Sequence, residues 1–292
     1  MKILLLIDAN ALIHRFFHAL PPFTSPDGRP TGALYGLASV LLKILREQKP
    51  DYIAAAFDRP APTFRKEAFE EYKKHRPPTA TELIAQMQEA HTLFAMFHIK
   101  TFEMPGFEAD DLIGTLAERY KNDPLLAGGR VVVLSGDRDL LQLVDDDKVV
   151  AELIKTGASE TVPYNERAVQ EYYGGLSPRQ LPDYKGLVGD PSDNIPGVEG
   201  VGPKTATELL KEFSSVEEVY ENLMIITPKT AKKLEGKKDI ALLSKKLATI
   251  RLDTPIELNG LATLKAEPPD AKTLTDYFEK LGFKSLIERL GR

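Results

Sequence analysis

Acidic residues occur in this chain at positions where a metal ion could be bound. Three short apolar runs end at an aspartate, in residues 3–8, 53–58 and 131–137. Such runs, bounded by turn residues, are typical of the buried strands of a parallel sheet. Ligand sites in open α/β sheets form beyond the carboxyl ends of the strands, so we expect Asp8, Asp58 and Asp137 to converge there. Because clustered carboxylates repel one another, this pattern predicts a divalent metal site.

A fourth group of acids extends this prediction. Glu108, Asp110 and Asp111 occupy three of four consecutive positions at the start of a predicted helix, 108–121. Acids in the first turn also interact favourably with the helix dipole. Three of them exceed what a cap needs, however, and Glu108 and Asp111 share one helix face. The pattern therefore favours a metal ion over a cap.

Two further acidic pairs have weaker claims to the same chemistry. Asp137 and Asp139 lie on a predicted strand-to-helix turn, where an aspartate also serves as an N-cap. Asp190 and Asp193 lie in a Gly-Asp-Pro-Ser-Asp-Asn segment, which first indicates a turn. Either pair could reach one cation, and the spacing alone leaves both interpretations open.

The elements that must position these acids alternate between strands and helices up to about residue 150. This alternation predicts βαβ units and an α/β class, with a central, mostly parallel sheet flanked by helices. From about residue 165 the pattern is helical and interrupted by proline and glycine, so we place a soft boundary there. Helices are expected at 33–47, 108–121 and about 140–143, and strands at 3–8, 52–58 and 131–135, with an extended segment at 99–102.

Two segments are basic although the chain as a whole is acidic. Residues 59–76 hold six Lys and Arg against three Glu, a net charge of +3, and residues 228–246 hold seven Lys against two acids, a net charge of +5. A basic rim around an acidic pocket suits a polyanion. The segment Tyr72-Lys73-Lys74-His75-Arg76 adds an aromatic ring for base stacking. An amphipathic helix end explains 72–76 equally simply, and solvated helix faces explain 228–246.

A glycine-rich segment at 197–205 resembles a phosphate-binding Walker A loop but does not fit one. Pro203 separates the last glycine from Lys204, and no strand precedes the segment. A tight hairpin between two helices fits better, with Gly200 and Gly202 allowing close backbone approach and Pro203 in the first helical turn. The N–H groups of such a hairpin, together with Lys204, can hold a DNA phosphate.

Composition limits the remaining possibilities. The chain has 292 residues, 42% of them hydrophobic, no cysteine and a net charge of -5. No disulfide scaffold or cysteine zinc site is possible, and the first apolar run is too short for a signal peptide or a membrane span. We expect a cytoplasmic protein without a membrane partner.

Taken in order, these motifs resemble the 5′-nuclease domain of bacterial DNA polymerase I and the wider flap-endonuclease family. The resemblance runs from Leu4 to about Leu290. It implies a PIN-like or resolvase-like catalytic domain with a helical arch at 1–168. It also implies a helical DNA-binding part with a helix-hairpin-helix motif at 169–292.

The resemblance also implies roles for individual residues. One metal site would use Asp8, Asp58, Glu108 and Asp110 or Asp111, and a second would use Asp137, Asp139, Asp190 and Asp193. Lys73 and Arg76, with Tyr72 beside them, would act on the scissile phosphate. Arg65 and Lys185 would lie near substrate phosphates, and the hairpin with Gly200, Gly202, Lys204 and Thr205 would grip the duplex, with a bound K⁺.

The implied function is a structure-specific 5′ nuclease with two Mg²⁺ or Mn²⁺ ions. It would act on DNA with a 5′ flap, a nick or an RNA primer during replication and repair, as a monomer fused or coupled to a DNA polymerase. One alternative is a PIN-like metal-dependent ribonuclease, but such enzymes are usually shorter and lack the 197–205 hairpin. The other is a non-catalytic DNA-binding scaffold, which would have lost some of the acids.

Overall fold

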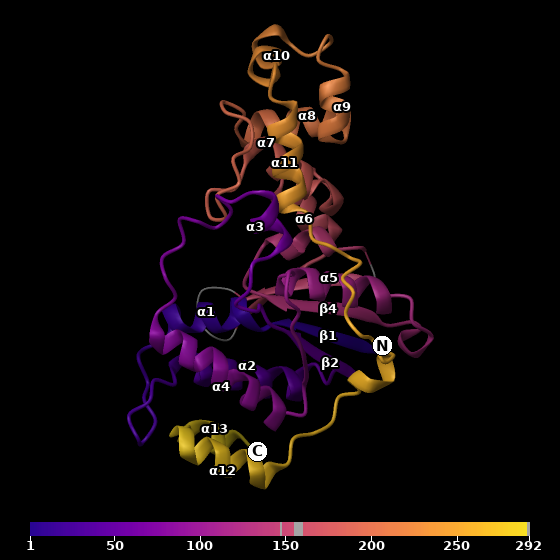
Figure 1. Ribbon diagram of the computed structural model, residues 1–292. Coiled ribbons are helices and arrows are strands. Elements are labelled where there is room, and N and C mark those ends of the chain that lie inside the picture. The colour runs from indigo at the N-terminus through magenta and orange to yellow at the C-terminus, as the bar shows by residue number, and fades with distance from the viewer. Residues whose placement is uncertain (147, 155–159, 291–292) are drawn as a thin grey trace.

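A six-stranded sheet with the order β3-β2-β1-β4-β5-β6 forms the centre of the protein (Figure 1). The computed structural model describes residues 1–146, 148–154 and 160–290. Strands β1 to β5 run parallel, and β6 pairs antiparallel with β5. The predicted class, α/β with a mostly parallel sheet, is confirmed. The strands are β1 Ile3–Asp8, β2 Tyr52–Ala56, β3 Lys100–Phe102, β4 Arg130–Ser135, β5 Val149–Ile154 and β6 Thr161–Tyr164.

Both faces of the sheet are covered by helices (Figure 1). Side chains alternate along β1, so Leu5 and Ile7 join one buried cluster while Leu4 and Leu6 join the other. The central strands are therefore apolar throughout. The first face is covered by α1 Ala9–Ala19, α2 Gly32–Glu47 and α4 Thr81–Met96, and the second by α5 Ala109–Tyr120.

A second group of helices forms its own hydrophobic core at one end of the molecule (Figure 1). Helix α7, residues 189–202 and α8 form the expected helix-hairpin-helix motif, in which Pro203 is the first residue of α8. The helices of this part are α6 Glu166–Tyr172, α7 Leu181–Val188, α8 Pro203–Phe213, α9 Val216–Glu221, α10 Pro228–Leu234 and α11 Lys238–Ala248. The 3-10 turns are η1 Pro124–Leu126, η2 Asp139–Leu143, η3 Pro178–Gln180 and η4 Leu261–Leu264.

The chain after α11 returns to the sheet, although it lies beyond the expected division at 168/169. Ile250 and η4 are buried in the cluster that also contains α5. Helices α12 (Ala271–Leu281) and α13 (Lys284–Leu290) pack beside α2 and α4 through Leu274 and Phe278. The packing therefore includes these C-terminal segments in the catalytic body, because their apolar faces complete its core.

The segment expected to form a helical arch is mostly not helical. Only α3, Phe64–Ala68, is helical, and residues 70–76 form turns and a bend. Lys73 has a φ of 55°, a left-handed conformation that a continuous α-helix excludes. The expectation of a helix end at 72–76 is therefore wrong for this structure.

Within the described residues, no helix combines the length and apolar character needed to cross a membrane.

Candidate active site

The first acids of the site are fixed at the carboxyl ends of β1 and β2. Asp8 caps α1 by accepting the Ala11 N–H at 2.9 Å, and its other oxygen accepts the Ser135 hydroxyl at 2.6 Å. Asp58 accepts the Ala109 N–H at 2.7 Å, which ties the end of β2 to the start of α5. Hydrogen bonds to two backbone N–H groups and one hydroxyl thus hold these strand-end carboxylates in place.

Asp110 is crowded by the strand-end acids. Burial, together with the charges of Asp8 and Asp137, raises the pKa of Asp110 well above its usual range. Burial likewise raises the pKa of Asp8 to about 7, with further contributions from Asp58 and Asp137. Their negative charges therefore destabilise one another, as expected where a cation is to be bound.

Glu108 faces the residues of the expected arch. Lys73 Nζ lies 2.9 Å from its Oε1, and the Tyr72 hydroxyl donates to its Oε2 at 3.1 Å. Burial of the Lys73 ammonium group opposes its charge, but the carboxylates of Glu108 and Asp193 outweigh this effect and raise the pKa of Lys73. The predicted catalytic residues Tyr72 and Lys73 therefore contact the predicted metal ligands directly.

Asp111, one of the two alternatives for a metal ligand at this position, does not lie with the other acids. It is fully buried and accepts two hydrogen bonds from Arg65, at 2.7 and 2.8 Å. Its oxygens also accept the N–H groups of Glu108 at 3.0 Å and Arg251 at 2.8 Å. Asp110 is thus the better-placed member of the pair.

Arg65 is buried and does not reach the surface expected for a phosphate contact. Its side chain is 3% exposed, and besides Asp111 it donates to the carbonyls of Leu247 at 2.8 Å and Thr249 at 2.9 Å. Although burial opposes the charge, Asp111 raises the pKa of Arg65. Its role in this structure is to join α3, α5 and the end of α11.

The second acidic group surrounds a lysine. Lys185 Nζ contacts Asp139 and lies 2.6 Å from Asp190 Oδ2. Asp137 accepts the Asp139 N–H at 2.9 Å. Burial and Asp137 raise the pKa of Asp139 to about 7, although Lys185 opposes the shift. Lys185 was expected near substrate phosphates, and here it neutralises two predicted ligands.

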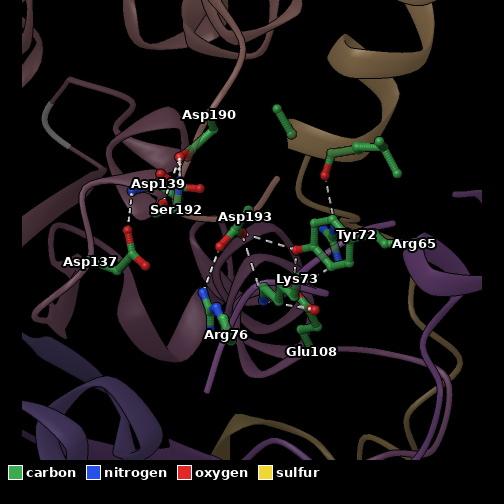
Figure 2. Close-up of polar contacts among 12 residues, drawn as sticks. Arg65, Tyr72, Lys73, Arg76, Glu108, Asp137, Asp139, Asp190, Ser192 and Asp193 are labelled. Carbon is green, nitrogen blue, oxygen red and sulfur yellow. Dashed lines mark hydrogen bonds and ion pairs between the residues drawn. The ribbon is translucent and has the colours of Figure 1, made fainter. Parts of the chain in front are cut away.

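Asp193, on the loop after α7, binds the residues of the 70–76 turns (Figure 2). Its oxygens lie 2.5 Å from Arg76 Nη2, 3.2 Å from the Tyr72 hydroxyl and 3.8 Å from Lys73 Nζ. Its carbonyl accepts the Lys73 N–H at 2.9 Å. The loop after α7 and the 70–76 turns are therefore held together by the side chains predicted to act in catalysis.

A cavity of about 620 Å³ opens beside the second acidic group and contains residues that the motifs do not identify. Arg15, Arg138 and Tyr173 line it together with Asp137 and Asp139. Arg15 follows Asp8 at helical spacing, seven positions later, and this spacing is the signal that could have revealed it. Its guanidinium adds a cation at the mouth of the site.

In the described part of the chain, no three acidic or histidine side chains are already arranged to hold a metal ion. Lys73 and Arg76 bind Glu108 and Asp193, and Lys185 binds Asp139 and Asp190. Four of the predicted metal ligands are therefore engaged in ion pairs with lysine or arginine. A divalent ion would compete with them for the same oxygens.

The hairpin after α7 exposes the residues predicted to bind nucleic acid. Gly197 has a φ of 63°, and a Cβ there would lie 2.2 Å from the Gly189 nitrogen, so only glycine fits. Gly202 precedes α8, and the Lys204 side chain is 91% exposed. Gly200 and Thr205 lie beside them, at the tip and in the first turn of α8.

The sequence matches two family models along most of its length. Residues 3–174 match the 5′-3′ exonuclease, N-terminal resolvase-like domain, and residues 176–272 match the 5′-3′ exonuclease, C-terminal SAM fold. DNA polymerase I of Bacillus subtilis is 44% identical over 99% of this chain, which spans 32% of that protein. A 5′-3′ exonuclease of Aquifex aeolicus is 36% identical over 100% of this chain and 96% of its own length.

Solved structures share the fold. The T5 5′-exonuclease with bound zinc has a TM-score of 0.70 at 22% identity, covering 85% of this chain and 89% of that one. The catalytic core of Rad2 in complex with DNA has a TM-score of 0.63 at 15% identity, covering 99% and 92%. These likenesses concern the fold alone. The matches to the family models and to the Aquifex aeolicus relative show that the chain belongs to the 5′-3′ exonuclease family and is a nuclease hydrolase.

Proposed function

We propose that the chain is a structure-specific 5′ nuclease that cleaves DNA carrying a 5′ flap, a nick or an RNA primer. The observation that carries this proposal is the meeting of two acidic groups with Tyr72, Lys73 and Arg76 at the carboxyl edge of the sheet. Acids and cations in one place suit a reaction in which a metal-bound phosphate is hydrolysed.

The donor set fits two divalent ions. The first would be held by Asp8, Asp58, Glu108 and Asp110, and the second by Asp137, Asp139, Asp190 and Asp193. Every donor is a carboxylate oxygen, which suits the hard ions Mg²⁺ and Mn²⁺. When bound, such ions activate water and stabilise the leaving oxygen, which would give a 5′-phosphate and a 3′-hydroxyl.

Lys73 and Arg76 would position the scissile phosphate. Their present partners, Glu108 and Asp193, belong to the two proposed metal sites. Once divalent ions neutralise these acids, both cations can turn to the phosphate and offset the charge that develops on it. Tyr72, between the same acids, would hold the 70–76 turns in place. Its ring is 4% exposed and packs with Ile195 and Leu247, so its role here is to position Lys73 and Arg76 rather than to stack on a base.

The hairpin would bind the duplex beside the cleavage point. Exposed N–H groups near Gly200 and Gly202, with Lys204 and Thr205, suit a phosphate contact that does not depend on sequence. The carbonyls of the same turn are oxygen donors of the type that K⁺ uses. A monomer coupled to a DNA polymerase would deliver this activity to replication and repair, as the polymerase I relatives suggest.

The test compares the double variant Asp110→Asn/Asp137→Asn with the wild type on a 5′-flap duplex in Mg²⁺ and in Mn²⁺. The variant keeps the size of both side chains but removes one charge from each proposed site, so cleavage should fall at least 100-fold. Asp276→Asn, which changes an exposed acid on α12, is the matched control. Wild-type cleavage by the double variant would refute the two-ion site.

A further inference from the structure

Helix α10 presents a row of lysines away from the protein core. Lys232 and Lys233 lie three and four positions after Lys229, so all three side chains share one helix face. On the opposite side, Ala231 and Leu234 pack into the helical core. The row is therefore held in place by apolar packing and points outward.

The positive charge of this segment is not balanced locally. Residues 228–238 contain five lysines and a single acid, Glu235. Lys229, Lys232 and Lys237 are exposed, and among the described residues they form no ion pair with a carboxylate. A helix face that is merely solvated commonly pairs its lysines with acids three or four positions away. The like charges here repel one another, which favours binding of a polyanion.

This lysine surface, defined here as Lys229, Lys232, Lys233 and Lys237, adjoins the hairpin. Lys233 Nζ donates to the Gly200 carbonyl at 2.7 Å, so α10 lies directly against the turn proposed to hold a phosphate. Figure 1 shows α10 at the end of the molecule farthest from α12 and α13. The two helices also begin with the same four residues, Pro-Lys-Thr-Ala, at 203–206 and 228–231.

We propose that the lysine surface binds the phosphate backbone of the same DNA duplex as the hairpin and lengthens the protein's footprint on it. The proposal rests on the proposed nuclease function, which supplies the duplex. It extends that function by assigning phosphate contacts outside the hairpin and the catalytic edge. Charge complementarity and continuity with the hairpin point to a duplex, because the lysines continue a surface that already approaches one.

The test measures how binding of duplex DNA depends on salt, in EDTA so that no cleavage occurs. The triple variant Lys229→Ala/Lys232→Ala/Lys237→Ala is compared with Lys272→Ala/Lys280→Ala/Lys284→Ala. The control removes the same charge from exposed lysines of α12 and α13. Each phosphate contact adds about 0.9 to the slope of log K against log salt, so the α10 variant should lose about 2.7 from that slope. Shortening the duplex should weaken wild-type binding and reduce this difference.

The two proposals fail in different ways. If the α10 variant and the control have the same slope, the lysine surface is not a DNA contact, whatever the nuclease assay shows. If the wild type binds duplex DNA but does not cleave a 5′ flap in Mg²⁺ or Mn²⁺, the proposed function fails instead. At saturating substrate the α10 variant should cleave at the wild-type rate, because its lysines lie outside the catalytic edge. Circular dichroism checks that both triple variants are folded.

Discussion

Replacing Asp111 with asparagine should destabilise the protein strongly without removing a metal ligand. Asp111 and Arg65 are 0% and 3% exposed and are joined by two hydrogen bonds at 2.7 and 2.8 Å. In Asp111→Asn the guanidinium of Arg65 stays buried and loses the charge of its bidentate partner, which leaves only the more distant carboxylate of Glu108, at 3.4 Å. The asparagine also replaces one carboxylate oxygen by an NH2 group, which would face the N–H of either Glu108 or Arg251 instead of accepting from it.

The size of the effect follows from these contacts. Removing one partner of a buried ion pair costs roughly 3–5 kcal/mol, because the other charge is left uncompensated. A folded domain is stable by only about 5–15 kcal/mol. Asp111→Asn should therefore remove a large share of the free energy of unfolding. In Arg65→Met/Asp111→Leu both charges are absent, so the double variant should recover much of that loss.

Urea unfolding of the wild type, Asp111→Asn and the double variant measures these differences. Asp253→Ala is the control, because it breaks an exposed ion pair with Arg251 whose side chains are 44% and 69% exposed. That pair should contribute little. An Asp111→Asn variant as stable as the control would refute the structural role of the pair. Calorimetric titration of folded Asp111→Asn with Mn²⁺ then asks whether metal binding persists, as expected.

Three further predictions concern other parts of the molecule. In Gly197→Ala the new Cβ would meet Gly189 at the end of α7, and strain at a φ of 63° adds roughly 1–3 kcal/mol; duplex binding should weaken, whereas Gly128→Ala, which has a similar φ of 72° but open space around it and lies outside the hairpin, should bind normally in the same assay. Lys73→Ala should slow flap cleavage yet tighten Mn²⁺ binding measured by calorimetry without DNA, because it frees Glu108 from an ion pair at 2.9 Å. Burial raises the pKa of Tyr220 to about 12, so the folded state keeps a proton that the unfolded state loses. Stability should therefore fall from about pH 10 to pH 12, and Tyr220→Phe should show a smaller fall in urea unfolding.

The sequence predicts that the strand-end acids meet at one edge of the sheet, because the apolar runs identify the strands and the aspartates lie at their ends. Asp8 and Asp58 each follow an apolar run, and parallel strands must end at the same edge. The edge strands are harder to predict. Strand β6 contains Pro163 and has no fully buried residue, so it lacks the apolar pattern that identifies β1 and β4.

The spacing of Glu108 and Asp111 predicts their shared helix face but not the partner of Asp111. The two residues do share a helix face, but they form a capping box in which Asp111 accepts the Glu108 N–H. The partner that decides the role of Asp111 is Arg65, which lies 46 positions earlier. Helical periodicity carries no information about a contact at that separation, so the sequence alone could not choose between Asp110 and Asp111.

Charge counting does not show which cations of the two basic segments are available to DNA, for the same reason. In 59–76, three of the six cations already have acidic partners from elsewhere in the chain: Arg65 with Asp111, Lys73 with Glu108 and Arg76 with Asp193. These cations are available to DNA only if their acids gain another counter-ion. Lys229, Lys232 and Lys237 of the lysine surface need no such exchange, because they are exposed and form no ion pair among the described residues. DNA binding in the absence of metal should therefore depend more on α10 than on the 70–76 turns. Cleavage, in contrast, should depend more on the 70–76 turns than on α10.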